Sequence, residues 1–268
     1  MITGIEISEA NGVFDWANTT AAFALIHHGS GTSGVDSQFT ANIIGAANRK
    51  IPFGVIHTIK PEKNFKKTAE VVSNLFGYPL PPITLVSTHG GLTKQKLMDY
   101  LSKMYNQIFL LTGNKYRPII ATNIGFWNAS VARNDFAKKH DLMVYRWTSA
   151  ADPSEPNDWL DINNPVRWTL WNYGKSESGV GLVRFNGDAA AFKRTFGIDP
   201  AVVNDDPQLP PPVDPKLAVT KYRSNMRLTP YGDILVTVNP GVPFEIVGKT
   251  DDHYAVVVYF REDVVDVS

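Results

Sequence analysis

Short runs of β-branched and apolar residues alternate with longer amphipathic stretches through the first 198 residues of the chain. In residues 93–111, for example, Leu97, Leu101 and Met104 lie three and four positions apart, which is the spacing of a helix that buries one face. The alternation predicts βα units around a mostly parallel sheet, and the number of units suits a TIM-like (β/α) barrel. The expected strands are residues 4–8, 22–27, 53–58, 83–88, 117–122, 142–147 and 167–172, and the expected helices are 37–49, 65–75, 93–111 and 130–139.

A proline-rich run at residues 199–216 interrupts this pattern, with prolines at 200, 207, 210, 211, 212 and 215. Such a run excludes a helix or a central strand and favours an extended, semi-rigid linker. All 6 tryptophans precede it. Beyond it, residues 217–268 show short β-branched runs separated by turn signals, which predicts a small all-β domain. We therefore expect a barrel domain at 1–198, a linker at 199–216 and a β domain at 217–268.

Charge and cysteine content narrow the function. Lys plus Arg and Asp plus Glu are both 26, so no overall field favours nucleic acid or an anionic membrane. A neutral glycan or a protein partner fits this balance better. The chain has no cysteine, which excludes disulfides and thiolate metal sites. Its first residues lack a basic segment followed by a long apolar one, so we expect no signal peptide and no membrane span.

In a barrel of this type, chemistry is expected at the carboxyl ends of the strands. Histidines lie at three of these ends, at His27, His57 and His89, and three imidazoles can bind zinc. No His-x-x-x-His or His-Glu-x-x-His helix accompanies them, and neighbouring His27 and His28 point to opposite faces of a strand. We therefore expect no metal and no cofactor, and assign the histidines to glycan binding or to structural roles.

Several segments resemble, in order and spacing, the glycoside hydrolase family 25 lysozymes: residues 4–8, Asp15-Trp16, 23–36, 54–57, 118–122, Phe126-Trp127 and 168–173. The resemblance implies a muramidase-type barrel whose two-carboxyl chemistry acts on peptidoglycan. By position, the family's first-strand Asp corresponds to Glu6, and its late Asp corresponds to Asp188, followed by Phe192. The family's Asp-x-Glu motif falls on Val86-Ser87-Thr88, which contains no carboxylate. An acid from residues 152–158, ahead of Trp159, is an alternative that the sequence leaves open.

The resemblance thus implies a peptidoglycan-recognising barrel with impaired catalysis, in effect a pseudoenzyme. Two alternatives stay open: an active N-acetylmuramidase that uses Glu6 and Asp188 as catalytic residues, and a structural phage-particle protein that keeps only the fold. The expected glycan-binding residues are His57, Thr88, His89, Asn123, Trp147, Trp171 and Tyr173. Trp171 also suits a core position, because tryptophan is usually buried.

Residues 241–248 and the following His253-Tyr254 resemble bacterial Src-homology-3-like domains, although a structural or oligomerising β module fits equally. This combination of domains without a signal peptide is typical of bacteriophage endolysins and virion-associated lysins. We therefore expect a phage protein that stays in the host cytoplasm until release, or is carried in the virion, and acts at the cell wall. Other phage structural proteins are possible partners, and nucleic acid and membranes are not expected.

Overall fold

The computed structural model describes residues 1–61, 64–148, 152–160 and 168–201, together with the backbone of strands between 216 and 257. The chain divides into two compact units, Met1–Val203 and Asn204–Ser268. Residues 202–215 of the expected linker lie outside the described residues. The fold of the first unit positions the candidate site, and the two units are considered separately.

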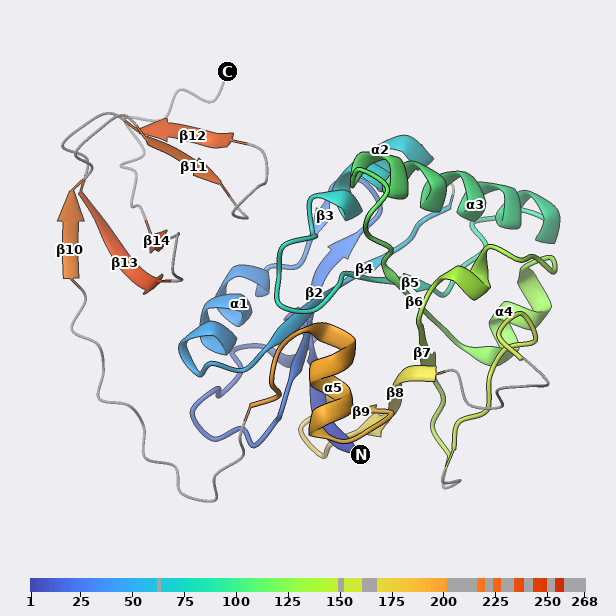
Figure 1. The fold of residues 1–268 in the computed structure, drawn as a ribbon, viewed down its shortest axis with the longest axis horizontal. Helices are drawn as coiled ribbons and strands as arrows, with labels where there is room; N and C mark the ends of the chain where they lie inside the picture. The colour runs from blue at the N-terminus through green and yellow to red at the C-terminus, as the bar shows by residue number, and fades with distance from the viewer. Residues whose placement is uncertain are drawn as a thin grey trace. The chain divides into compact units, whose positions relative to one another are not determined.

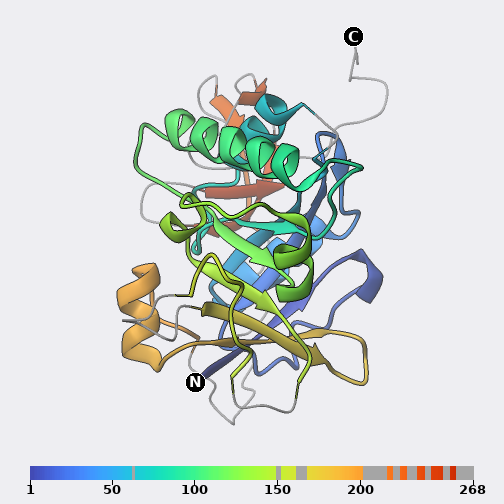
Figure 2. The ribbon, with the colours of Figure 1, turned by 90° about the vertical axis from the view of Figure 1, so that its right-hand side faces the viewer.

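The strands of the first unit close into an α/β barrel (Figures 1 and 2). Neighbours are parallel from β1 round to β8, whereas β9 is antiparallel to both β8 and β1 and completes the ring. A short arm, β3 (Gly34–Val35), pairs only with β2. The barrel strands are β1 (Ile2–Ile7), β2 (Ala24–Ser30), β4 (Phe53–Thr58), β5 (Ile83–Val86), β6 (Ile119–Thr122), β7 (Leu142–Tyr145), β8 (Trp168–Lys175) and β9 (Gly181–Phe185).

Helices lie outside the strands, and side-chain caps fix where several of them begin. Asn64, Thr93 and Asn123 each accept a hydrogen bond from a backbone N–H in the first turn of α2, α3 and α4. The α-helices are α1 (Phe39–Asn48), α2 (Phe65–Ser73), α3 (Lys94–Leu111), α4 (Ile124–Ser130) and α5 (Ala189–Phe196), and the 3-10 turns are Glu9–Asn11 and Ala137–Lys139. None of the described helices combines the length and apolar character needed to cross a bilayer.

Side chains alternate between the barrel interior and the layer under the helices. Leu25, Ile56, Met143 and Leu170 belong to the buried cluster that fills the barrel. The outward residues of the same strands pack in two other clusters, against α2–α4 on one side and α1 on the other. This alternation decides which strand-end residues reach the barrel mouth, the name used below for the end where the parallel strands finish.

Most expected elements are present, and three differ. The helix expected at 130–139 is wrong: α4 begins six residues earlier, directly after the Asn123 cap, and ends at Ser130. The pattern also missed β9 and α5, the elements that close the barrel. Apolar residues alternate along β9, but a following antiparallel strand needs no long crossover, so the βα pattern did not indicate it.

The second unit is all-β in its described residues. β10 (Lys216–Val219), β13 (Pro243–Lys249) and β14 (Tyr254–Val257) form one antiparallel sheet. β11 (Ser224–Arg227) and β12 (Ile234–Val238) form an antiparallel pair.

Candidate functional site

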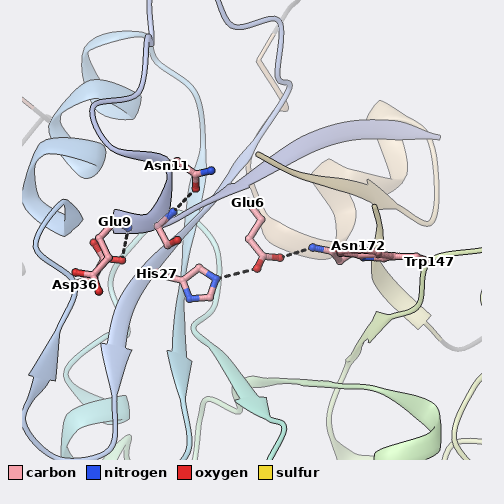
Figure 3. A network of polar contacts seen from close by, with 8 residues as sticks. Glu6, Glu9, Asn11, His27, Asp36, Trp147 and Asn172 are labelled. Carbon is pink, nitrogen blue, oxygen red and sulfur yellow. Dashed lines mark hydrogen bonds and ion pairs between the residues drawn. The ribbon is translucent and has the colours of Figure 1, made fainter. Parts of the chain in front are cut away.

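On each barrel strand, every second side chain points into the barrel, and these side chains are called the interior row of that strand. Several interior rows end in a polar side chain at the barrel mouth. Following each strand outward from the apolar interior cluster leads to Glu6 on β1, His27 on β2, Tyr145 on β7 and Asn172 on β8. Trp147, two residues beyond the end of β7, lies beside Asn172 (Figure 3). These side chains come from strands far apart in sequence and meet because the barrel closes.

Glu6 is the centre of this group. One carboxylate oxygen, Oε1, lies 2.8 Å from His27 Nε2, and Asn172 Nδ2 donates to the other oxygen, Oε2, at 2.8 Å (Figure 3). The side chains of His27 and Glu6 are only 19% and 11% exposed, respectively. Both oxygens are thus held in hydrogen bonds, Oε2 as the acceptor from Asn172 and Oε1 with the ring nitrogen of His27, so the carboxyl group has a fixed orientation.

Trp147 extends the network to the surface. Its indole Nε1 donates to Asn172 Oδ1 at 3.0 Å, so the amide of Asn172 is held in one orientation between Trp147 and Glu6. The Trp147 side chain is nevertheless 64% exposed. A tryptophan held by one edge, with its ring open to solvent, provides a flat apolar surface of the kind on which a sugar ring can stack.

Tyr145 adds a buried hydroxyl below this group. Burial, followed by the nearby negative charge of Glu6, raises the pKa of Tyr145 well above its usual value. The hydroxyl lies close enough to feel that charge, yet it makes no hydrogen bond of normal geometry in the described structure. Tyr145 therefore stays a neutral phenol and cannot supply a second negative charge.

No second carboxylate accompanies Glu6 among the described ends of the interior rows. Gly181 lies opposite Glu6 on β9, and a Cβ there would lie 2.9 Å from the Glu6 Cβ. On β5, Leu85 faces the interior, whereas Val86 packs under the helices. Of Val86-Ser87-Thr88, only Ser87 continues the interior row that Leu85 belongs to, and it carries no carboxylate. The described ends other than Glu6 are His27, Thr58, Ser87, Asn123, Tyr145, Asn172 and Gly181.

Asp188 does not join Glu6. It is the N-cap of α5, where its Oδ1 accepts a hydrogen bond from the backbone N–H of Ala191 at 2.7 Å. Because β9 runs antiparallel to β1, Phe185 pairs with Ile2 and Gly181 with Glu6. Asp188 follows Phe185 and therefore lies toward the opposite end of the barrel, where α5 is close to the N-terminus (Figures 1 and 2). The structure thus contradicts the expected pairing of Glu6 with Asp188 across one site.

His57 lies on the outer side of its strand, away from the barrel mouth. Its Nε2 contacts the carbonyl oxygen of Gly31 at 2.8 Å, and its Nδ1 lies 3.1 Å from His28 Nδ1. Burial lowers the pKa of His57 to about 4, so the neutral ring donates from Nε2 to Gly31. Burial also lowers the pKa of His28, whose ring packs edge-on against Phe39 of α1. His27 faces Glu6 while His28 faces outward, so the expected opposite orientation of these neighbours is confirmed.

Thr88, His89 and Asn123 occupy loops at the mouth, where their polar atoms serve the backbone. Thr88 Oγ1 accepts from Gly90 N, and His89 Nδ1 accepts from Gly91 N at 3.1 Å. Asn123 caps α4 and also donates to the Tyr145 carbonyl at 3.0 Å. The His89 and Asn123 side chains are exposed and Thr88 is half-buried, so a ligand at the mouth can still reach them.

Trp171 and Tyr173 face away from the mouth. They flank Asn172 on β8, and because Asn172 points inward, they point outward. Trp171 is buried in the outer core and donates to the Arg146 carbonyl at 2.7 Å, which is the core alternative considered above. The Arg184 guanidinium lies 4.2 Å from the centre of the Tyr173 ring. Neither residue can share a sugar-binding face with Trp147 in this arrangement.

Two of the carboxylates in residues 152–158, Asp152 and Asp158, support the scaffold. Asp158 is buried and accepts hydrogen bonds from the Trp127 indole at 2.8 Å and from Asn134 Nδ2 at 2.9 Å. Asp152 Oδ2 accepts from the Trp168 indole at the start of β8, at 3.1 Å. Both are tied to tryptophans of the outer layer, and neither is linked to Glu6.

Tyr145 and Asn172 are not among the expected binding residues, and His27 was expected to bind glycan or to serve a structural role rather than to contact Glu6. His27 and Asn172 end predicted strands, so alternation from their apolar neighbours would have turned both inward beside Glu6. Tyr145 lies within an expected strand and gave no such signal. His27 and His57 face opposite sides of the barrel wall, and no group of three metal-ligating side chains occurs among the described residues.

Comparison with solved structures identifies the fold. A bacterial lysozyme from Streptomyces coelicolor superposes with a TM-score of 0.64 and 22% identity, covering 73% of this chain and 96% of that chain. A family GH25 lysozyme from Aspergillus fumigatus gives 0.63 and 21%, covering 73% and 98%. The Clostridium perfringens spore cortex lytic enzyme SleM gives 0.59 and 17%, covering 94% and 78%. No protein-family profile and no curated protein matches the sequence. The first unit therefore has the fold of family 25 lysozymes, and identities this low show the fold alone.

Proposed function

We propose that the barrel mouth recognises a glycan of the bacterial cell wall, with hydrolysis impaired relative to an ordinary muramidase. The lysozyme fold and the exposed Trp147 ring, which is linked to Glu6 through Asn172, support binding. The observation that carries the impairment is that no described interior row at the mouth supplies a carboxylate besides Glu6, whose two oxygens are already hydrogen-bonded to His27 and Asn172.

Glycoside hydrolysis needs one carboxyl group that gives a proton to the leaving oxygen and a second group that stabilises or attacks the sugar cation. Glu6 fits the second role, because hydrogen bonds to His27 and Asn172 hold both of its oxygens in place at the mouth. No described end of an interior row supplies a carboxylic acid for the first role. Loss of a general acid typically costs a factor of about 10²–10⁴ in rate, so any remaining hydrolysis is expected to be slow.

The wider assignment follows from the same resemblance. We propose a barrel domain at 1–198, a linker at 199–216 and a Src-homology-3-like domain at 217–268 that docks on the wall. An endolysin, CTP1L, is among the similar structures, with a TM-score of 0.57 and 16% identity. This likeness supports a phage origin, with the protein either released from the host cytoplasm or carried in the particle with other phage proteins.

The test is wall lysis by the purified full chain across the acidic to neutral pH range, with co-sedimentation on the same walls. Glu6→Gln is the test variant, and Asp188→Asn is the matched carboxylate control. Binding without lysis is the expected result. If the wild type lyses walls and Glu6→Gln does not, the protein is an active muramidase and the proposed impairment is wrong. The Asp188 variant would then show whether that carboxylate takes part. Absence of both binding and lysis would leave a structural particle protein.

A further inference from the structure

Trp147 and Lys175 form an exposed pair beside the Glu6 network. The Lys175 ammonium lies 6.0 Å from the centre of the Trp147 ring. The N–H edge of the Trp147 ring is held in place, because it donates a hydrogen bond to Asn172, which in turn donates to Glu6. An anchored aromatic ring and a positive charge thus lie together at the mouth, and Glu6 lies on the far side of Asn172.

The charge of Lys175 is not neutralised by any carboxylate in the described residues. The described ion pairs join Glu6 to His27, Asp135 to Lys138 and Asp199 to Lys193. A separation of 6.0 Å is the outer limit of a cation–π contact, so the ring holds the ammonium weakly. A flexible lysine with no counter-ion, next to an open aromatic ring, is available to pair with an anionic group on a ligand.

We infer that this pair selects a pyranose that carries a free carboxylate, with the sugar face on Trp147 and the carboxylate on Lys175. The inference rests on the proposed glycan binding and names Lys175 as its specificity-determining residue. Glu6 fixes the direction of the ligand, because its negative charge repels a carboxylate placed on the Asn172 side. A neutral sugar, or one whose carboxylate is blocked as an amide, stacks on the same ring without using Lys175.

Two kinds of sugar present this chemistry: a muramic acid whose lactyl group bears no peptide, and a uronic acid. The probes are a peptide-free disaccharide of N-acetylglucosamine and N-acetylmuramic acid, its amide, and a glucuronic-acid disaccharide. Dissociation constants are measured with the full chain for the wild type, Lys175→Gln and Trp147→Ala. Lys193→Gln is the matched control, since that lysine is exposed but already paired with Asp199 at 2.9 Å.

The wild type is expected to bind the free acid roughly two- to fivefold more tightly than its amide, the range of a solvent-exposed ion pair. Lys175→Gln should abolish this preference and leave affinity for the amide unchanged, whereas Lys193→Gln should keep it. Added salt should reduce the preference. Preference for only one of the two acids identifies the source of the carboxylate.

A preference that survives in Lys175→Gln, or equal affinity of the wild type for acid and amide, would overturn the inference. If the inference about Lys175 fails but Trp147→Ala still weakens binding of the amide, the proposed glycan binding at the mouth stands without a carboxylate preference. If no probe binds, or Trp147→Ala changes nothing, both the site and the specificity are overturned.

Discussion

Replacing His57 with glutamine should reduce the acid sensitivity of the barrel. His57 is buried, and its folded-state pKa is about 4, because burial disfavours the charged ring. An exposed histidine in the unfolded chain has a pKa of about 6.5. The unfolded state therefore binds more protons between these values. The stability that the neutral ring confers is complete above about pH 6.5 and is lost as the pH falls toward 4.

The magnitude follows from the two pKa values. By about pH 5 the unfolded histidine is almost fully protonated and the folded one is not, which costs about 2 kcal/mol of unfolding free energy. Glutamine does not titrate, and its amide can still donate toward Gly31. When the pH falls from neutral to about 5, we therefore expect the unfolding free energy of His57→Gln to decrease by about 2 kcal/mol less than that of the wild type. His140, whose pKa is also lowered to about 4 by burial, provides an independent second site for the same measurement.

Urea unfolding followed by tryptophan fluorescence isolates the relevant unit, since all 6 tryptophans precede the proline-rich run. His57→Gln and His140→Gln should each flatten the pH dependence, and the double variant should combine the two effects because the sites do not share partners. An unchanged slope in His57→Gln would refute the reasoning. It would mean that His57 has similar pKa values in the folded and unfolded states, as a solvent-facing ligand residue can have.

Three further substitutions test other parts of the account. Asp188→Ala should lower the unfolding free energy by about 0.5–2 kcal/mol, because the α5 cap is lost, and it should leave wall binding unchanged. Loss of wall binding in a folded Asp188→Ala variant would show that Asp188 belongs to the site. Gly45→Ala should cost about 1–3 kcal/mol, because the new Cβ would lie 2.1 Å from the Trp16 ring; equal or greater stability in thermal unfolding would contradict that contact. Asp158→Ala should cost about 3 kcal/mol by leaving the buried Trp127 indole N–H unpaired; a change of less than about 0.5 kcal/mol would show that water replaces the carboxylate.

The barrel was predictable because apolar residues recur with a different period in strands and in amphipathic helices, and this spacing can be read from the sequence. Its closure was not, since β9 reverses direction after a short turn and leaves no βα signal. This one reversal accounts for the error at Asp188: the residue follows the last strand along the chain, but that strand runs toward the opposite end of the barrel.

The candidate site was predictable in part. Alternation along each strand turns Glu6 inward, and the same rule applied to β8 separates Asn172 from Trp171 and Tyr173. Trp171 and Tyr173 were expected to bind glycan because they are aromatic, and that expectation did not take the alternation along β8 into account. The hydrogen bonds that fix both oxygens of Glu6 involve His27 on β2, which pairs with β1, and Asn172 on β8, which is separated from β1 by β9. Only the closed barrel brings these strands together around Glu6.

The most direct test of the account is the indole N–H signal of Trp147 in an NMR titration of the full chain with wall glycan fragments. A Trp147→Phe variant assigns the signal. The account predicts that this signal shifts on binding, while the signal of buried Trp171, bonded to the Arg146 carbonyl, stays in place. Binding that leaves the Trp147 signal unchanged would place the glycan elsewhere and contradict the assignment of the barrel mouth as its site.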